Sequence, residues 1–306
     1  MTGTAFPPAT SAPSSAAAVA ELSAGARLRR RMFGQKSFVF GVGLLLVIVA
    51  VALLAPVLAP HDPYAQNLSQ RMVPPFWYVK GGWEHLLGTD NLGRDYLSRL
   101  LYGARISLLI GLSVMVISGL IGTTLGLLAG YFGGKADLIV TFLITTRLAM
   151  PVILVALAVV AMVGGSLPVV ILVLGLLKWD RFAVVMRSAT QQARALDYVT
   201  AAEAAGASTP RIILGEILPN VFPQLIVVAT LEAASAILLE AALSFLGLGV
   251  QPPLPSWGLM ISEAKTYMFF SFWLIAIPGT LLALLVLSIN LAGDGLRDVV
   301  APEGRG

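Results

Sequence analysis

Two carboxylates interrupt an otherwise apolar stretch, residues 224–248, and have the clearest potential for chemistry. Glu232 and Glu240 are eight residues apart, so they fall near one face of a helix. Such side chains could titrate during proton coupling, line a solute pathway or pair across helices, with Arg147 as a candidate partner. A protonated or paired glutamate bonded to a neighbouring helix is an equally good interpretation.

The residue types needed for catalysis or for a resident cofactor are scarce. The sequence contains no cysteine, and His61 and His85 are its only histidines. We therefore expect no thiolate nucleophile, no histidine relay and no metal site. The G-x-x-x-x-G-K-[ST] loop that cradles nucleotide phosphates is also absent from the sequence. We expect no enzymatic activity and no cofactor bound by this chain.

The composition indicates a membrane protein. Apolar residues make up 57% of the 306 residues and charged residues only 12%, about half of the ~25% found in soluble domains. A chain so poor in charge cannot cover its own surface with polar groups. Nucleic-acid binding is excluded because no basic stripe with interleaved aromatic residues is present. We expect an all-α protein that crosses the lipid bilayer several times.

The distribution of charges divides the chain into segments. We expect residues 1–36 to form a disordered, basic, cytoplasmic tail and residues 37–59 to form the first span. This uncharged run is too long for a cleaved signal peptide. Residues 60–104 are then an outer loop, residues 105–292 a core of five spans, and residues 293–306 a cytoplasmic tail.

The middle of the core allows two readings. Residues 148–177 carry no charge and could form one tilted helix, or parts of two helices folded at the Gly- and Pro-rich turn at residues 164–168. Two helices place twelve Lys and Arg on the cytoplasmic side and six outside, which fits the positive-inside rule. The prediction is therefore six spans, with both termini cytoplasmic and Arg147 inside the third span.

Small residues recur at every fourth position of the second span. They are Ser118, Gly122, Gly126 and Gly130, followed by Gly134. This spacing places them on one helix face, where another backbone can approach closely. The face could pack within one subunit, or it could let the helix slide or rotate against its neighbours during transport.

A polar segment, residues 187–222, has no use in crossing a bilayer. Residues 187–205 favour a helix, and Gly206 can adopt the left-handed conformation that ends it. A short second helix is predicted to begin at Thr209 and to stop at Pro219. The natural use of such a cytoplasmic loop is docking of another protein.

Three motifs in this loop form a recognisable pattern: Tyr198-Val199-Thr200-Ala201-Ala202, Gly206-Ala207-Ser208 and Leu218-Pro219-Asn220. The pattern resembles the EAA loop of ATP-binding-cassette importer permeases, the coupling helix that sits in a cleft of the ATPase subunit. Thr200 stands where that family usually has glutamate, and Glu203 lies one turn onward. The resemblance assigns coupling to Tyr198, Thr200, Ala201, Ala202, Glu203, Gly206, Ala207, Ser208, Leu218 and Pro219.

Three further motifs resemble those of dipeptide, oligopeptide and nickel permeases. They are Leu87-Gly88-Thr89-Asp90 with Gly93-Arg94-Asp95, Leu243-Ser244-Phe245-Leu246-Gly247 with Ser256-Trp257-Gly258, and Gly293-Asp294-Gly295. The resemblance implies a C-type permease with the type I importer fold in a bacterial cytoplasmic membrane. It also implies a second homologous permease, two ATP-binding subunits that use ATP and magnesium, and an external solute-binding protein.

The polar residues of the outer loop have their own physical interpretation. Asp90 could cap a helix that begins near Asn91, with Arg94, Asp95 and Arg99 as neighbours. These side chains form either a solvated outer face or a contact with a binding protein. For Trp257 we expect an interfacial anchor, with a gating role as the alternative.

The leading hypothesis is a permease subunit that imports peptides and is driven by ATP hydrolysis in partner subunits. The same machinery for nickel or another small solute remains open. A proton-coupled carrier that uses Glu232 or Glu240, and a membrane scaffold without a transport role, are hypotheses from other classes.

Overall fold

Long apolar helices dominate the computed structural model, which describes residues 34–300 and, within that part, contains helices and loops but no β-strand. Residues 1–33 and 301–306 lie outside the described residues, and with them nearly all of the tail expected at residues 1–36. Side chains are described through Arg297.

Four helices in the described part are long and apolar enough to cross a membrane. They are α3 (Lys36–Leu58), α4 (Tyr96–Phe132), α11 (Leu218–Phe245) with the short segments that precede it, and α13 (Trp273–Val300). The helix α3 matches the predicted first span because no charge interrupts it after Lys36. The protein is therefore an all-helical, multi-pass membrane protein.

A bent helix pair is, taken together, long and apolar enough to be a fifth span. The helices α5 (Gly134–Leu148) and α6 (Val152–Val163) meet at an angle of 81°. Pro151 occupies the N-cap of α6, where its missing N–H and fixed φ favour a new helix start over continuation of α5. Arg147 lies in the last turn of α5, beside this bend.

The turn predicted at residues 164–168 is confirmed. The helix α6 ends at Gly164, whose φ of +106° suits glycine, and α7 (Leu167–Leu177) begins directly after Ser166. Pro168 stands in the first turn of α7, where its missing N–H costs no hydrogen bond. The uncharged stretch therefore folds as two helices, and α8 (Asp180–Arg194) follows α7 after a short break.

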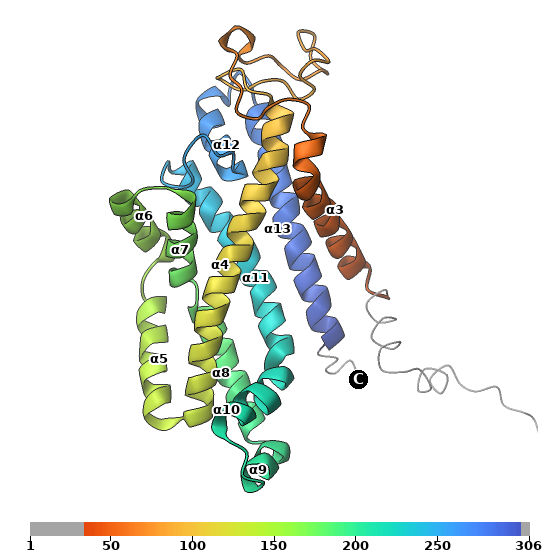
Figure 1. Ribbon diagram of the computed structural model, residues 1–306. Helices are drawn as coiled ribbons and strands as arrows, with labels where there is room; N and C mark the ends of the chain where they lie inside the picture. The colour runs from red at the N-terminus through yellow and green to blue at the C-terminus, as the bar shows by residue number, and fades with distance from the viewer. Residues whose placement is uncertain (1–33, 301–306) are drawn as a thin grey trace, which may run out of the picture.

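The helices form one elongated bundle around α4 (Figure 1). The helices α7 and α8 lie end to end along α4, while α3 and α11 pack on its other sides, and α13 packs against α3 and α11. At the lower end in Figure 1 lie α9 (Asp197–Ala204) and α10 (Thr209–Arg211); we call it the α9 end. Residues 59–95 and α12 (Trp257–Ala264) lie at the opposite end, the loop end.

The predicted ladder of small residues packs α8 against α4 within the same chain. A Cβ atom on Gly126 would lie 2.7 Å from Met186 Cβ, and one on Gly130 would lie 2.6 Å from Thr190 Cβ. Ser118 is buried and donates to the Val114 carbonyl at 2.7 Å. The close approach of the two backbones therefore depends on the absence of side chains at these positions.

Two boundaries differ from the sequence prediction. The helix α4 begins at Tyr96, inside the predicted outer loop, because Asp95 caps it by accepting from the Ser98 N–H at 2.8 Å. Asp90 does not cap a helix near Asn91; it accepts from the backbone N–H groups of the following loop. At the other terminus, α13 continues to Val300, so residues 293–300 extend the last helix.

The polar segment after α8 also differs from its prediction. The helix expected over residues 187–205 is broken, because Leu196 adopts an extended conformation between α8 and α9. Pro219 does not stop the next helix: α10, a π-helical segment (Ile212–Ile217) and α11 form one 37-residue span. In the π-helical turn the Leu218 N–H donates to the Ile213 carbonyl. This wider turn accommodates Pro219, so the helix continues through it.

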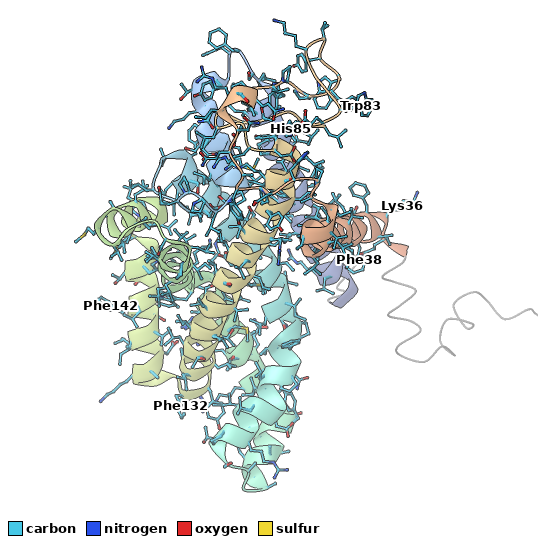
Figure 2. The ribbon with its side chains drawn as sticks, turned by 45° about the horizontal axis from the view of Figure 1, so that its top comes forward. Lys36, Phe38, Trp83, His85, Phe132 and Phe142 are labelled. Carbon is cyan, nitrogen blue, oxygen red and sulfur yellow. The ribbon has the colours of Figure 1, made fainter. Side chains whose placement is uncertain are left out.

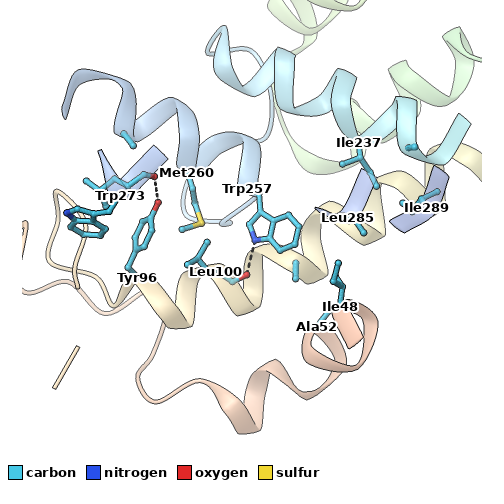
Figure 3. Close-up of a cluster of buried hydrophobic side chains, with 14 residues drawn as sticks. Ile48, Ala52, Tyr96, Leu100, Ile237, Trp257, Met260, Trp273, Leu285 and Ile289 are labelled. Carbon is cyan, nitrogen blue, oxygen red and sulfur yellow. Dashed lines mark hydrogen bonds between the residues drawn. The ribbon is translucent and has the colours of Figure 1, made fainter. Parts of the chain in front are cut away.

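A buried aromatic cluster ties the loop end together (Figure 3). Trp257 of α12 donates from Nε1 to the Leu100 carbonyl of α4 at 2.9 Å. The Tyr96 hydroxyl donates to the Leu274 carbonyl of α13, and its ring meets Trp273 edge to face at 5.3 Å. These contacts fix α12 and α13 against the start of α4.

Candidate coupling site and buried charge clusters

The helix α9 and the turn after it form a protrusion at the α9 end of the bundle (Figure 1). The turn is a Schellman motif: the Ala207 N–H reaches the Ala202 carbonyl at 3.0 Å, and the Gly206 N–H reaches the Glu203 carbonyl at 3.0 Å. Gly206 has a φ of +78°, which confirms the left-handed conformation predicted for it. The shape of the turn therefore depends on glycine at this position.

One face of the protrusion is anchored in the bundle. Val199 is buried in a cluster with Leu127 and Met186. Tyr198, Ala202, Ala207 and Leu218, all half-buried, pack against the same cluster. The inner face of α9 is therefore part of one apolar cluster with residues of α4, α8 and α11.

The opposite face of the protrusion is exposed. The exposed residues of the predicted coupling set are Thr200, Ala201, Glu203, Gly206, Ser208 and Pro219. Glu203 accepts from the Tyr131 hydroxyl at 3.3 Å, so its carboxylate is directed toward the end of α4. Arg194 donates to the Tyr131 carbonyl and lies 5.2 Å from the centre of its ring.

Glu232 is an ion-pair partner across helices, one of the roles considered for it. Its carboxylate lies 2.7 Å from Lys178 Nζ and 3.2 Å from an Arg181 guanidinium nitrogen. Lys178 also donates to the Ser235 hydroxyl at 2.8 Å. Sequence reasoning missed Lys178 and Arg181 as partners, although they are the cations that follow α7.

Arg147 does not pair with either glutamate. Its guanidinium donates to the carbonyls of Leu177 and Met150 and lies 4.0 Å from the Asp180 carboxylate. The bend after α5 turns Arg147 toward the junction of α7 and α8, so the expected partnership is wrong.

Glu240 lies in a separate polar environment. It is fully buried and accepts from the hydroxyls of Ser244 at 2.7 Å and Ser256 at 3.0 Å. Ser256 also caps α12. Glu240 therefore connects α11 to the start of α12 at the loop end of the bundle.

The polar residues before α4 are buried, so their expected role as an exposed outer face is contradicted. The Asp90 carboxylate pairs with Arg94 at 2.6 Å and with Arg99, and both arginines also reach Glu263 of α12. Asp95 is buried with them. Glu263 lies far away in the sequence and was missed for that reason. The group forms an internal ionic cluster between the loop and α12.

Trp257 is buried as well, and the expectation of an interfacial anchor is wrong. Only 2% of its surface is exposed. The indole packs directly against Gly103 of α4, where a Cβ atom would lie only 2.8 Å from the Trp257 ring. Trp257 therefore packs α12 onto α4.

The residues just described lie largely within a region matched by a family model. Residues 122–305 match the binding-protein-dependent transport system inner membrane component family, and residues 23–75 match the N-terminal transmembrane domain of oligopeptide transport permease C. The chain belongs to this permease family. The first match includes α9, Glu232 and Glu240, so the protrusion at α9 and the buried carboxylates lie within the family region.

Curated relatives match nearly the whole permease. The di/tripeptide transport system permease protein DppC of Pseudomonas aeruginosa is 46% identical over 86% of this chain and 87% of its own length. The dipeptide transport system permease protein DppC of Haemophilus influenzae is 41% identical, with coverage of 86% and 89%. A probable D,D-dipeptide transport system permease of Escherichia coli is 36% identical, with coverage of 92% and 93%.

A solved structure confirms the fold class of the permease. An inward-facing structure of the MetNI methionine ABC transporter superposes with a TM-score of 0.53 at 20% identity. The match covers 66% of this chain and 96% of that chain. The shared feature is the ABC importer permease fold.

A cavity of about 690 Å³ lies among α3, α4 and α11 of the permease. Its walls are mainly aliphatic, with Tyr64, Tyr102 and Arg105 as polar groups on one side. Partial burial raises the pKa of the Tyr64 phenol above its usual value.

Proposed function

We propose that this permease is the C-type subunit of an ATP-binding-cassette importer that moves di- and oligopeptides across the inner membrane. The observation that carries the proposal is the protrusion at α9, whose outer face is exposed and whose inner face packs on α4, α8 and α11. A partner that moves α9 therefore moves the bundle as a rigid body. Two relatives named for dipeptide and di/tripeptide transport support peptides as the solute class.

In this proposal the chain crosses the membrane six times and α9 faces the cytoplasm. The pairs α5 with α6 and α7 with α8 each serve as one broken crossing. The α9 end carries Lys135, Arg194 and Arg211, which supports a cytoplasmic location under the positive-inside rule. Both termini are then cytoplasmic as well.

The proposed assembly contains a second homologous permease, two ATP-binding subunits and an external solute-binding protein. ATP and magnesium act in the ATP-binding subunits. The exposed residues Thr200, Ala201 and Ser208 are proposed to contact a groove of one ATP-binding subunit.

A cross-linking experiment tests the coupling contact. Because the chain has no cysteine, Ser208→Cys introduces its only thiol. In the assembled complex, this thiol should cross-link to an ATP-binding subunit, whereas Gln66→Cys at the loop end should not. Deletion of residues 198–210 should release the ATP-binding subunit during purification.

Transport in proteoliposomes tests the direction of energy flow. The complete complex should take up labelled dipeptide only with ATP and the solute-binding protein. Purification of the chain without partners, together with solute uptake driven by a pH gradient, would replace this proposal with the carrier hypothesis.

A further inference from the structure

Three potential metal ligands meet at the loop end of the bundle. The side chains of His61, His85 and Asp95 each offer a ligand atom, and these atoms all lie within 4.8 Å of one another. Asp95 Oδ1 is 2.8 Å from His85 Nδ1 and 3.4 Å from His61 Nδ1. The ligand atoms of a tetrahedral zinc site are about 3.3 Å apart, given metal–ligand distances of about 2.0–2.1 Å. The 3.4 Å separation matches this value, whereas the 2.8 Å separation is that of a hydrogen bond, so one small cation would require His85 and Asp95 to move apart by roughly 0.5 Å.

The ligands come from two parts of the fold that surrounding hydrogen bonds hold together. Asp95 uses Oδ2 to cap α4 through the Ser98 N–H, which leaves Oδ1 for the imidazoles. The His61 backbone N–H donates to the Ser98 hydroxyl at 3.1 Å. His85 lies in the loop next to the start of α4 (Figure 2). The site is thus built on a helix N-terminus and braced from the loop.

The contacts around His85 allow a tautomer whose lone pair is directed at Asp95. Its Nε2 faces the Gln70 Oε1 atom at 3.4 Å. That amide is oriented because Asn67 donates to Oε1 at 2.9 Å and Gln70 Nε2 lies 3.3 Å from Glu84. A neutral imidazole that donates to Gln70 presents a lone pair from Nδ1 to the Asp95 carboxylate. In that tautomer a proton or a metal ion between Nδ1 and Oδ1 makes the arrangement favourable, whereas in the other tautomer the Nδ1–H itself donates to Asp95.

We propose that His61, His85 and Asp95 bind one divalent transition metal, with zinc as the ion that best matches two imidazoles and a carboxylate. His61 is exposed and gives the ion a path from solvent, whereas His85 and Asp95 are buried. Three protein ligands leave a fourth position for water. The bound ion joins residues 61 and 85 of the loop to α4. The expectation that the sequence holds no metal site is thereby revised.

Gln70 is the supporting residue of this site. By accepting from His85 Nε2, it fixes the ring orientation and the tautomer that directs Nδ1 to the metal. Loss of such a support weakens metal binding by about 10- to 100-fold in known sites.

Equilibrium dialysis of the full chain in detergent tests the proposal. The protein carries a purification tag without histidine, is stripped with a chelator and is dialysed against zinc chloride at pH 8, where a protonated imidazole is scarce. We expect one zinc per chain in the native protein. His61→Ala, which removes an exposed side chain, should lose the zinc while its circular dichroism spectrum stays unchanged.

Further variants separate a metal site from a hydrogen-bonded cluster. Gln70→Ala should still bind one zinc per chain, with about 10-fold weaker affinity. Glu84→Ala removes a nearby carboxylate outside the ligand set and should bind zinc as the native chain does. Zinc should also protect the loop from trypsin at Lys80 in the native chain and not in His61→Ala. Absence of zinc at pH 8, or equal zinc binding by native protein and His61→Ala, would show that the three side chains form only a proton-bridged cluster.

Discussion

At Glu232, one buried carboxylate contacts two cations from the segment after α7. Lys178 is itself buried, whereas Arg181 is exposed. Removing charges from water is costly, and the pair offsets that cost only while both partners are present. The contact therefore fixes α11 against the junction of α7 and α8.

The variant Glu232→Gln should destabilise the permease by about 3–5 kcal/mol, because Lys178 remains buried without its counter-charge. Thermal unfolding in detergent measures the loss. The double variant Lys178→Met with Glu232→Leu should recover much of the stability, and the half-buried Glu216→Gln should behave as the native protein does. An unchanged melting temperature for Glu232→Gln would show that the pair contributes little.

A second prediction concerns Gly206 and the coupling of ATP hydrolysis to uptake. Its φ of +78° costs a β-branched side chain about 1–2 kcal/mol, so Gly206→Val should distort the turn after α9. We expect the reconstituted complex to keep its ATPase activity and lose peptide uptake, with normal membrane insertion. Gly215→Ala, in open space at a right-handed position, is the control. Native uptake by Gly206→Val would count against the coupling role of this turn.

Single residues could be predicted where the signal is local. Gly206 was identified because a left-handed turn needs only its own backbone and the helix before it. The partners of Glu232, and the contact of Arg94 and Arg99 with α12, could not be predicted, because they join segments that only the bundle brings together. Glu263, which meets Arg94 across 169 residues of sequence, is the clearest case.

Among the elements, the contact of α8 with α4 depends on three glycines at four-residue spacing. Gly122, Gly126 and Gly130 each leave no room for a Cβ against α8. The helices cannot separate slightly to admit one, because α5 and α11 pack on the same pair. The contact is therefore sensitive to a single added carbon.

The variant Gly126→Ala should destabilise the bundle by about 1–3 kcal/mol, because its Cβ would lie 2.7 Å from Met186 Cβ and 2.8 Å from the Ala183 carbonyl. Denaturant unfolding followed by circular dichroism measures the effect. Gly43→Ala in α3, where a Cβ meets open space, is the matched control. Equal stability of the two variants would show that α4 and α8 have space to adjust.

Turn chemistry predicted some element boundaries and failed at others. The turn after Gly164 followed from a glycine and a proline that act locally. Pro219 was expected to stop a helix, but the π-helical segment before it supplies the wider turn that a proline needs. Asp90 and Asp95 are both able caps by residue type; Asp95 caps α4, while the Asp90 carboxylate accepts from the loop and pairs with Arg94 and Arg99.

For the whole molecule, the decisive prediction concerns sidedness. In intact cells, Ser208→Cys should resist a membrane-impermeant thiol reagent and react once the cells are opened, because the α9 end is proposed to be cytoplasmic. Gln66→Cys at the loop end should react from outside. Labelling of Ser208→Cys in intact cells would reverse the topology and remove the proposed coupling role with it.

The continuity of α10, the π-helical segment and α11 makes this part of the chain a lever. At 1.5 Å per residue, its 37 residues extend roughly 55 Å. A tilt of about 5° at the foot would swing the tip by roughly 5 Å, a distance comparable to one helical turn. A small rotation of the segment beside α9 would therefore produce a larger displacement at Glu240 and at the segment that leads into α12.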